Sequence, residues 1–381
     1  MDTQHDHQTI TSLIREYYAS AAIAPYKTES REFGVGTFER KIMYRHLSFQ
    51  SPSDLNAYLT EKGPPYVSYS SAYYARPSSR PMETKGLLGS ELVFDLDATD
   101  MKLPCQSVHG RSWVCGICLD SVKAETIKLA EDFLMRDFGF TEKELGINFS
   151  GNRGYHIHIK KESVLGLGAA ERKQISDYIA GNGLDIELLF PTMGQRGVRL
   201  IGPKPTDKGW KGRLARGTVS LLEKSPEELA SMGIDRKEAA NLHSKRALIA
   251  MGIKSGNWDM VYIKNKAAFW KLTLSKQAIS QSDRIDGNVT NDPSHLIRLP
   301  DSIHGETGLT SKRINSLADL ARFEPLSDAV AFAKGEVNVI AESPDEFTMN
   351  GRSFGPYHAE KVEIPSYAGI YLVLKGRAHF A

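Results

Sequence analysis

Glu91-Leu92-Val93-Phe94-Asp95-Leu96-Asp97 is the stretch that decides the fold of this chain. Its alternation predicts a strand, because successive side chains of a strand point to opposite faces. The leucines and the phenylalanine share a face that packs into a core, whereas Asp95 and Asp97 lie side by side on the other. Neighbouring carboxylates repel one another unless a cation lies between them, and hard oxygen ligands favour Mg²⁺ or Mn²⁺. The alternative is a solvated strand end before a turn at residues 98–100.

The composition limits the class of protein. The chain has 381 residues, of which 41% are hydrophobic, enough for more than one structural unit. A net charge of +2 does not announce a nucleic-acid partner, so any basic surface must be local. No apolar run approaches a transmembrane length, and residues 1–5 lack a signal-peptide pattern. The three cysteines lie between residues 105 and 118, so we expect no disulfides, no membrane and a cytoplasmic location.

Periodicity along the chain predicts an α/β body, of α+β type with a mixed sheet, that is interrupted by a helical subdomain. Helical spacing of apolar residues covers 8–19, 53–62, 119–138, 169–180 and most of 225–276. Strand-like patterns cover 31–35, 38–47, the two arms of 146–160, the region of 296 and 370–374. We therefore expect the α/β domain at 1–220 and 281–381 and the helical subdomain at 221–280.

A second motif lies at residues 150–158, Ser-Gly-Asn-Arg-Gly-Tyr-His-Ile-His. Its two glycines frame a tight turn in which the backbone can approach a phosphate closely. Ser150 and Arg153 are suited to bind phosphate oxygens, Arg153 through its forked geometry. His156 and His158 are two residues apart and share one face of the following strand. An anion site and an ordinary polar hairpin turn both remain open at this point.

A third group of residues lies far downstream. It consists of Arg-Ile-Asp at 284–286, His-Leu-Ile-Arg-Leu-Pro at 295–300 and Ser-Ile-His-Gly-Glu-Thr-Gly at 302–308. A carboxylate, an arginine and a histidine thus surround a short apolar strand. In isolation this pattern is weak, because a lone histidine near glycine is commonly a loop residue.

A fourth motif uses every cysteine of the chain: Cys105, His109, Cys115 and Cys118, with three, five and two residues between them. This set matches a tetrahedral Cys₃His zinc site, and three unrelated thiols in a loop are the alternative. Four protein ligands leave no open position, which favours structural zinc in a knuckle at residues 103–120.

A local basic stretch runs from Lys204 to Arg216 and contains Trp210. Basic residues around a tryptophan suit the backbone of a single strand with base stacking. A solvated loop is an equally good interpretation.

Together these four motifs resemble the small catalytic subunit of archaeal and eukaryotic DNA primases. Arg-Glu-Phe at 31–33 and the segment 367–376 also fit, so the resemblance covers nearly the whole chain, and the compact length and the knuckle suggest the archaeal branch. It implies the archaeo-eukaryotic primase catalytic fold. It also implies template-directed primer synthesis by nucleotidyl transfer during DNA replication, on single-stranded DNA, from nucleoside triphosphates and in a heterodimer with a large subunit.

The resemblance also implies roles for particular residues. Three carboxylates, Asp95, Asp97 and Asp286, would hold two Mg²⁺ or Mn²⁺ ions. The triphosphate would be bound by Ser150, Arg153, His156, Arg298 and His304, and Arg45 is a further candidate contact. Zinc would be held by Cys105, His109, Cys115 and Cys118.

Two residues depart from the family pattern. Asn152 stands where a second basic residue is common, and Glu306 stands where a lysine commonly follows His-Gly. A carboxylate cannot replace an ammonium near phosphate, so Glu306 either points away or lowers the nucleotide affinity.

Three other functions remain open from the sequence. They are an end-joining repair polymerase of the same superfamily, a two-metal phosphoesterase or nuclease, and a non-enzymatic zinc-containing nucleic-acid-binding module. The knuckle and the helical insert argue for a primase over the repair polymerase. The binding module leaves the three aspartates unexplained.

Overall fold

The computed structural model describes residues 3–101, 103–110, 113–193, 197–264, 266–278, 287–343 and 346–381. The chain forms two compact units. The first comprises Met1–Ile127, Thr141–Lys173 and Arg284–Ala381, and the second comprises Lys128–Phe140 and Gln174–Asp283. The second unit therefore includes residues well before 221. Among the described helices, none is long and apolar enough to cross a membrane.

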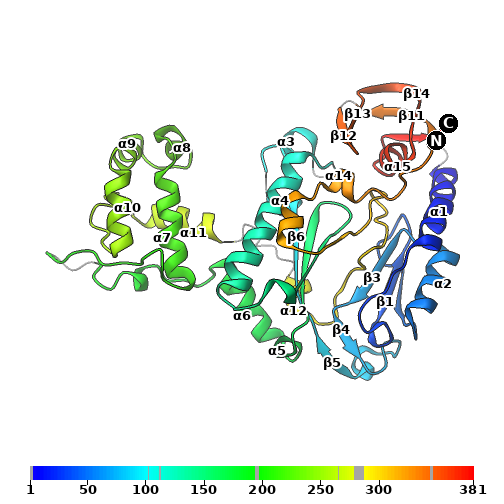
Figure 1. Cartoon of the computed structure of the whole chain (residues 1–381), viewed down its shortest axis with the longest axis horizontal. Helices are drawn as coiled ribbons and strands as arrows, with labels where there is room; N and C mark the ends of the chain where they lie inside the picture. The colour runs from blue at the N-terminus through cyan, green and yellow to red at the C-terminus, as the bar shows by residue number, and fades with distance from the viewer. Residues whose placement is uncertain are drawn as a thin grey trace. The chain divides into compact units, whose positions relative to one another are not determined.

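The strands that the structure describes all lie in the first unit (Figure 1). They are β1 (Phe33–Gly36), β2 (Tyr44–Leu47), β3 (Tyr66–Ser70), β4 (Ala72–Tyr74), β5 (Leu87–Ser90), β6 (Leu92–Asp97), β7 (Leu145–Phe149), β8 (Gly154–Ile159), β9 (Leu296–Arg298), β10 (Arg313–Ile314), β11 (Glu336–Ser343), β12 (Phe347–Met349), β13 (Arg352–Phe354), β14 (Tyr357–Pro365) and β15 (Ala378–Phe380).

Helices occur in both units. Those of the first are α1 (Thr3–Ser20), α2 (Pro52–Lys62), α3 (Gln106–His109), α4 (Gly116–Lys128), α5 (Glu162–Leu165), α12 (Gly287–Asn291), α13 (Leu317–Arg322), α14 (Pro325–Asp328) and α15 (Ser366–Leu374). The last residue of α4 and most of α6 (Ala169–Ala180) belong to the second unit. It also holds α7 (Gly209–Leu222), α8 (Pro226–Ser231), α9 (Arg236–Ser244), α10 (Arg246–Ser255) and α11 (Lys266–Gln277).

Two four-stranded sheets dominate the first unit, in the orders β2-β1-β3-β9 and β10-β7-β8-β6. A three-stranded sheet, β14-β11-β15, and the pairs β12-β13 and β4-β5 complete it. Every pairing between the described strands is antiparallel. The expected combination of helices and sheets is thus confirmed.

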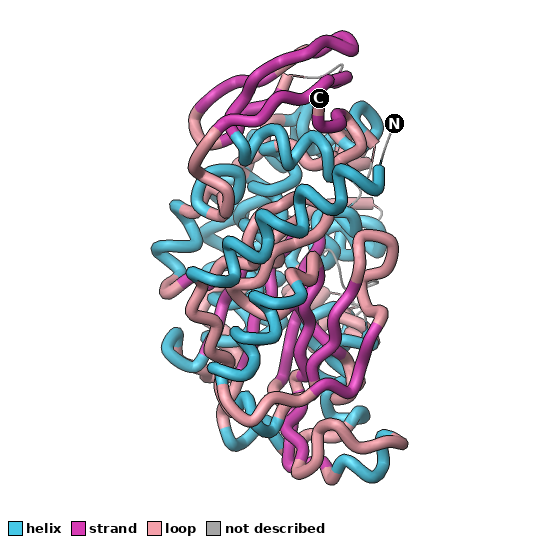
Figure 2. The backbone as a smooth tube through the Cα atoms, turned by 90° about the vertical axis from the view of Figure 1, so that its right-hand side faces the viewer, coloured by secondary structure: helices cyan, strands magenta, loops and turns pink. Residues whose placement is uncertain are grey.

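Helices α1 and α2 cover the first sheet. Ile10 and Ile14 of α1 and Leu59 of α2 are fully buried in one cluster with Phe33 of β1. Figure 2 views the molecule from the side of α1, which crosses in front of the strands. Ser51 caps α2 by accepting a hydrogen bond from the backbone N–H of Asp54.

The second sheet places the Asp-x-Asp strand beside the glycine-rich hairpin. In the pairing of β6 with β8, Asp95 lies opposite His156 and Asp97 lies opposite Gly154. A Cβ on Gly154 would lie 2.0 Å from the carbonyl oxygen of Leu96, so only glycine permits this approach. The two strands expected within 146–160 are confirmed as β7 and β8.

The prediction of a strand at 370–374 is wrong. These residues belong to helix α15, whose apolar side chains are buried around the whole circumference, from Tyr367 to Leu372. A short apolar run buried on all sides lacks the periodicity that separates a helix from a buried strand. Gly369 allows the helix to lie against β11, since a Cβ there would be 2.3 Å from a methyl carbon of Val337.

The second unit has its own core, built by α7, α9, α10 and α11 around Trp258, Trp270 and Phe190. The basic stretch at 204–216 belongs to this unit, and its residues from Gly209 on form the first turns of α7. Trp210 is only 6% exposed and donates from its indole N–H to the carbonyl of Tyr178. The guanidinium of Arg213 is buried against the carboxylate of Asp137. Base stacking on Trp210 is therefore excluded, because the ring is part of the core.

Candidate active site

One cavity of about 260 Å³ gathers the described catalytic and nucleotide-binding candidates of the sequence. It is bounded by β3 and β9 of the first sheet and by β6 and β8 of the second. The predicted residues that line it are Asp95, Asp97, Ser150, Arg153, His156, Arg298 and His304. The predicted third carboxylate, Asp286, lies outside the described residues.

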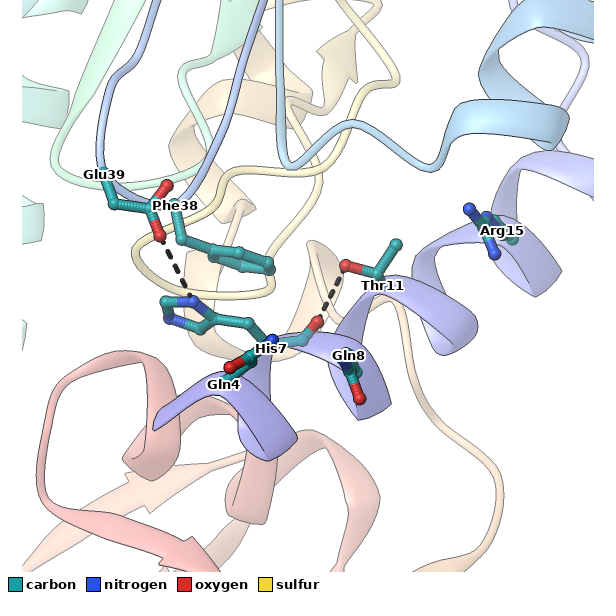
Figure 3. A pocket seen from close by; sticks show the side chains of 7 residues that line it. All are labelled: Gln4, His7, Gln8, Thr11, Arg15, Phe38 and Glu39. Atoms are coloured by element: carbon teal, nitrogen blue, oxygen red, sulfur yellow. Dashed lines mark hydrogen bonds and ion pairs between the residues drawn. The ribbon is translucent and has the colours of Figure 1, made fainter. Parts of the chain in front are cut away.

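A larger cavity, of about 550 Å³, opens beside α1 (Figure 3). Its lining comes from α1 and the segment 38–39, and the only carboxylate in it belongs to Glu39. The convergence of acids, guanidinium groups and imidazoles therefore distinguishes the smaller cavity as the candidate active site.

The two carboxylates end β6 and are each about one-third exposed, at 33% for Asp95 and 34% for Asp97. The Asp95 carboxylate lies 3.4 Å from Nε2 of His156. Asp97 accepts hydrogen bonds from the backbone N–H and the hydroxyl of Thr99, at 2.8 and 2.7 Å. Half-shielded hard oxygens on one strand face fit a hydrated divalent ion such as Mg²⁺ or Mn²⁺.

Two of the three histidines that line the cavity, His156 and His304, are neutral near pH 7. Burial lowers the pKa of His156 and that of His304 well below the ordinary value, and the charge of Arg298 adds to this. The side-chain amide of Asn148 donates to Nδ1 of His156, which places the proton on Nε2, facing Asp95. Nδ1 of His304 accepts from the backbone N–H of Glu306, so His304 also carries its proton on Nε2.

The two arginines supply the fixed positive charge. Nε of Arg153 lies 3.6 Å from Asp97. The guanidinium of Arg298 lies 4.9 Å from the centre of the Tyr66 ring and donates to the carbonyl of Val67 at 3.3 Å. This stacking holds Arg298 in one orientation before any ligand arrives.

The turn at 150–153 brings β8 close to the downstream loop. Gly151 has φ 88°, and a Cβ there would lie 2.8 Å from Cβ of His304. The Ser150 hydroxyl accepts from the backbone N–H groups of Gly154 and Asn152, at 3.2 and 3.4 Å. Ser150 thus shapes the turn as well as lining the cavity.

His158 does not line this cavity, although it shares a face with His156. It donates from Nδ1 to the buried carboxylate of Glu91 at 2.8 Å. The Tyr73 hydroxyl and the Arg31 guanidinium also bind this carboxylate. The network joins both sheets beneath the site.

The Cys/His cluster is assembled in space. Ligand atoms of Cys105, His109, Cys115 and Cys118 all lie within 4.8 Å of one another. The Gly110 carbonyl accepts from Nδ1 of His109, which leaves Nε2 to face the thiols. Burial raises the pKa of Cys115, but hydrogen bonds from the backbone of Cys118 and from His109 outweigh it and bring that pKa to about 7. The cluster can therefore hold a tetrahedral zinc ion.

Comparisons with known proteins agree with this geometry. The family model described as DNA primase small subunit matches residues 94–316. The DNA primase small subunit PriS of Methanococcoides burtonii is 35% identical, and the match covers 97% of each chain. PriS of Methanothrix thermoacetophila is 35% identical and that of Archaeoglobus fulgidus 33%, each over 96% of both chains. The chain belongs to the DNA primase small subunit family.

Family membership confirms the resemblance inferred from the motifs, including the fold class and the archaeal branch. Arg45, which the resemblance to primase small subunits suggested as a further nucleotide contact, binds other partners instead. Its guanidinium pairs with Glu32 at 3.0 Å and donates to the carbonyl of Ser294, and Arg45 is not among the residues lining the cavity.

Several residues that line the cavity were not among the predicted site residues: Lys41, Ser68 and His295. His295 begins the motif at 295–300, so its position was a usable signal. Lys41 carries no such signal, because it is an ordinary lysine in a loop between β1 and β2.

Proposed function

We propose that the chain is the catalytic subunit of a DNA primase that makes short primers on single-stranded DNA from nucleoside triphosphates. One observation carries the proposal: a single cavity joins the two carboxylates of β6 to two arginines and two neutral histidines. Acids that suit divalent metal lie next to cations that suit phosphate. Nucleotidyl transfer needs this combination.

In this proposal, Asp95 and Asp97 hold two Mg²⁺ or Mn²⁺ ions together with Asp286. Ions held there would supply activation of the primer 3′-hydroxyl and neutralisation of the charge on pyrophosphate. The neutral His156 orients the Asp95 carboxylate through Nε2–H, and Arg153 lies against Asp97.

The triphosphate is assigned to the cationic side of the cavity. Arg298, held by Tyr66, and Arg153 meet phosphate oxygens with forked N–H groups. His304 donates from Nε2 without adding charge. Donors fixed before the reaction stabilise charge that develops in the transition state without reorganisation.

The remaining features support the same role. Zinc in the closed Cys₃His cluster stabilises the local fold of 103–120 and leaves the chemistry to the β6 site. The name of the family implies a large partner subunit, so we expect a heterodimer. Because DNA replication in an archaeal cell takes place in the cytoplasm, we expect the chain to be cytoplasmic.

De novo synthesis on single-stranded DNA tests the proposal, with ribo- and deoxynucleotides compared, and with and without a candidate large subunit. Labelled primers are expected. Extension of annealed primers without de novo initiation of new strands would indicate a repair polymerase. Degradation of the template would indicate a nuclease.

The same assay tests the carboxylates. Asp95→Asn or Asp97→Asn should abolish incorporation, because each loses a charged metal ligand, while the free energy of unfolding stays equal or rises as like-charge repulsion is relieved. Asp100→Asn, just beyond β6 and outside the cavity lining, is the matched control. Near-normal activity of either β6 variant would refute the metal assignment.

A further inference from the structure

Four residues from four segments of the chain form one network of polar contacts beside the nucleotide cavity. We call it the Glu306 network, and its members are Lys41, Asn152, Glu306 and Lys375. Glu306 accepts from Nζ of Lys41 through one carboxylate oxygen, at 2.9 Å. Its other oxygen accepts from the side-chain amide of Asn152, also at 2.9 Å. The carbonyl oxygen of that amide accepts from Nζ of Lys375, at 3.4 Å. One carboxylate therefore links two lysines, one directly and one through Asn152.

The Glu306 network is continuous with the proposed triphosphate site. Lys41 and Asn152 line the same cavity as Arg153, Arg298 and His304. The backbone N–H of Glu306 donates to His304. The two family departures, Asn152 and Glu306, are thus in contact with one another and with lysines that come from distant parts of the chain.

Several cations act on the groups of the Glu306 network and on the neighbouring His304. After burial, the charges of Arg298, Lys41, Lys375 and Arg153 are the causes that lower the pKa of His304. Burial, and then Arg153 and Lys41, lower the pKa of Lys375 to about 8, although Glu306 acts in the opposite direction. Mutual repulsion of cations disfavours such a cluster, and a polyanion in the cavity would relieve it.

We propose that Lys41 and Lys375 are two further triphosphate-binding residues, and that Glu306 is their counter-ion in the absence of nucleotide. This inference rests on the proposed function and adds two lysines to the residues proposed for its triphosphate site. When a nucleoside triphosphate enters, its terminal phosphates compete with Glu306 for Lys41. The Lys41 side chain is 56% exposed, so it can exchange partners without opening the core.

The loop that carries Lys41 is fixed at both ends. A Cβ on Gly36 would lie 2.3 Å from the carbonyl oxygens of Arg40 and Lys41, so the loop folds back on β1 only with glycine there. On its other side, the Phe38 ring stacks on His7 of α1 with ring centres 4.2 Å apart, and Glu39 lies 3.5 Å from the same imidazole (Figure 3). This anchoring presents Lys41 to the cavity before nucleotide binds.

The first test measures binding of ATP and of AMP with Mg²⁺ to the full chain without template. Lys41→Gln and Lys375→Gln should each weaken ATP binding by about tenfold, since each loses a charge-assisted hydrogen bond to phosphate. AMP binding should change little, because it lacks the terminal phosphates. Equal loss for both ligands, or no loss for either, would overturn the assignment.

The second test is a double-mutant cycle on the counter-ion. Glu306→Gln should tighten ATP binding by about two- to fivefold, the range for releasing a partly exposed ion pair. The gain should vanish in a Lys41→Gln background, because Lys41 is the group set free. A gain that persists there, or a loss on Glu306→Gln alone, would refute the exchange. Glu61→Gln with Lys62→Gln, an exposed pair 2.7 Å apart, is the matched control and should have no effect.

Arg298→Ala separates this inference from the proposed function. If Arg298→Ala loses ATP affinity and the lysine variants do not, the proposed site stands and the inference fails. If Arg298→Ala binds ATP normally, the triphosphate assignment itself fails, and the inference with it.

Discussion

At the scale of single residues, buried imidazoles make stability depend on pH. Burial lowers the pKa of His158, more than Glu91 raises it, so the folded chain keeps this ring neutral where the unfolded chain protonates it. The unfolded state then binds more protons below its ordinary pKa of about 6.5, and stability falls with falling pH there.

His158→Gln isolates this contribution, because other groups titrate equally in both proteins. The loss of unfolding free energy between pH 7.5 and pH 5.5, measured by urea unfolding, should be smaller for the variant by up to about 1.4 kcal/mol per pH unit below 6.5. The same pH dependence in both proteins would show that His158 is protonated in the folded chain.

At the scale of elements, we expect the knuckle at 103–120 to draw part of its stability from a bound zinc ion. Cys105 and Cys115 remain partly exposed, and α3 is only four residues long. Cys115→Ser should abolish zinc binding and loosen this segment, because metal binding supplies the folding free energy of such modules.

Metal analysis and limited proteolysis check this expectation. Wild-type protein purified without chelator should contain about one zinc per chain, the stoichiometry of a tetrahedral site. Cleavage within 103–120 should be confined to the variant. The control is Ser107→Ala, which lies in α3 within the knuckle but outside the ligand set. This variant should keep its zinc.

Helix α15 also tests packing at the scale of an element. Gly369→Ala should lower the free energy of unfolding by about 1–3 kcal/mol, because the new methyl overlaps Val337 on β11. Gly166→Ala is the control, since a Cβ there meets nothing within 4 Å and its φ is negative. Equal stability of the two variants would mean that α15 is not packed as described.

At the scale of the whole molecule, each unit has a core of its own. Trp258 is fully buried among the residues of the second unit, whereas the candidate active-site residues belong to the first. Trp258→Ala should therefore destabilise the second unit by about 3–5 kcal/mol. ATP affinity should remain near normal, which a binding titration beside a thermal melt would show. Parallel loss of both properties would indicate one cooperative structure.

Sequence reasoning located the cavity well because its chemistry is written in local motifs. The alternation of β6 and the glycines around 150–154 are signals of backbone shape, and both elements formed as expected. Asp95, Arg153 and His304 then met in one cavity because the strands paired. Whether they perform the assigned roles is still a prediction.

What the sequence missed depends on tertiary packing. Lys41 and Lys375 are chemically ordinary, and only the fold brings them to Asn152 and Glu306. Trp210 lies among basic residues in the sequence, but in helix α7 its ring is buried in a core. The apolar run of α15 is buried on every side, so its sequence lacks the 3.6-residue hydrophobic periodicity that indicates a helix.

The pairing of β6 with β8 constrains how this chain can evolve. Because side chains alternate, adding or deleting one residue in β6 would exchange its two faces and turn Asp95 and Asp97 into the core. Substitutions can accumulate over generations, but we expect selection against single-residue length changes within these paired strands. Insertions should instead collect outside the paired strands, so a relative with a one-residue gap inside 91–97 is expected to lack this activity.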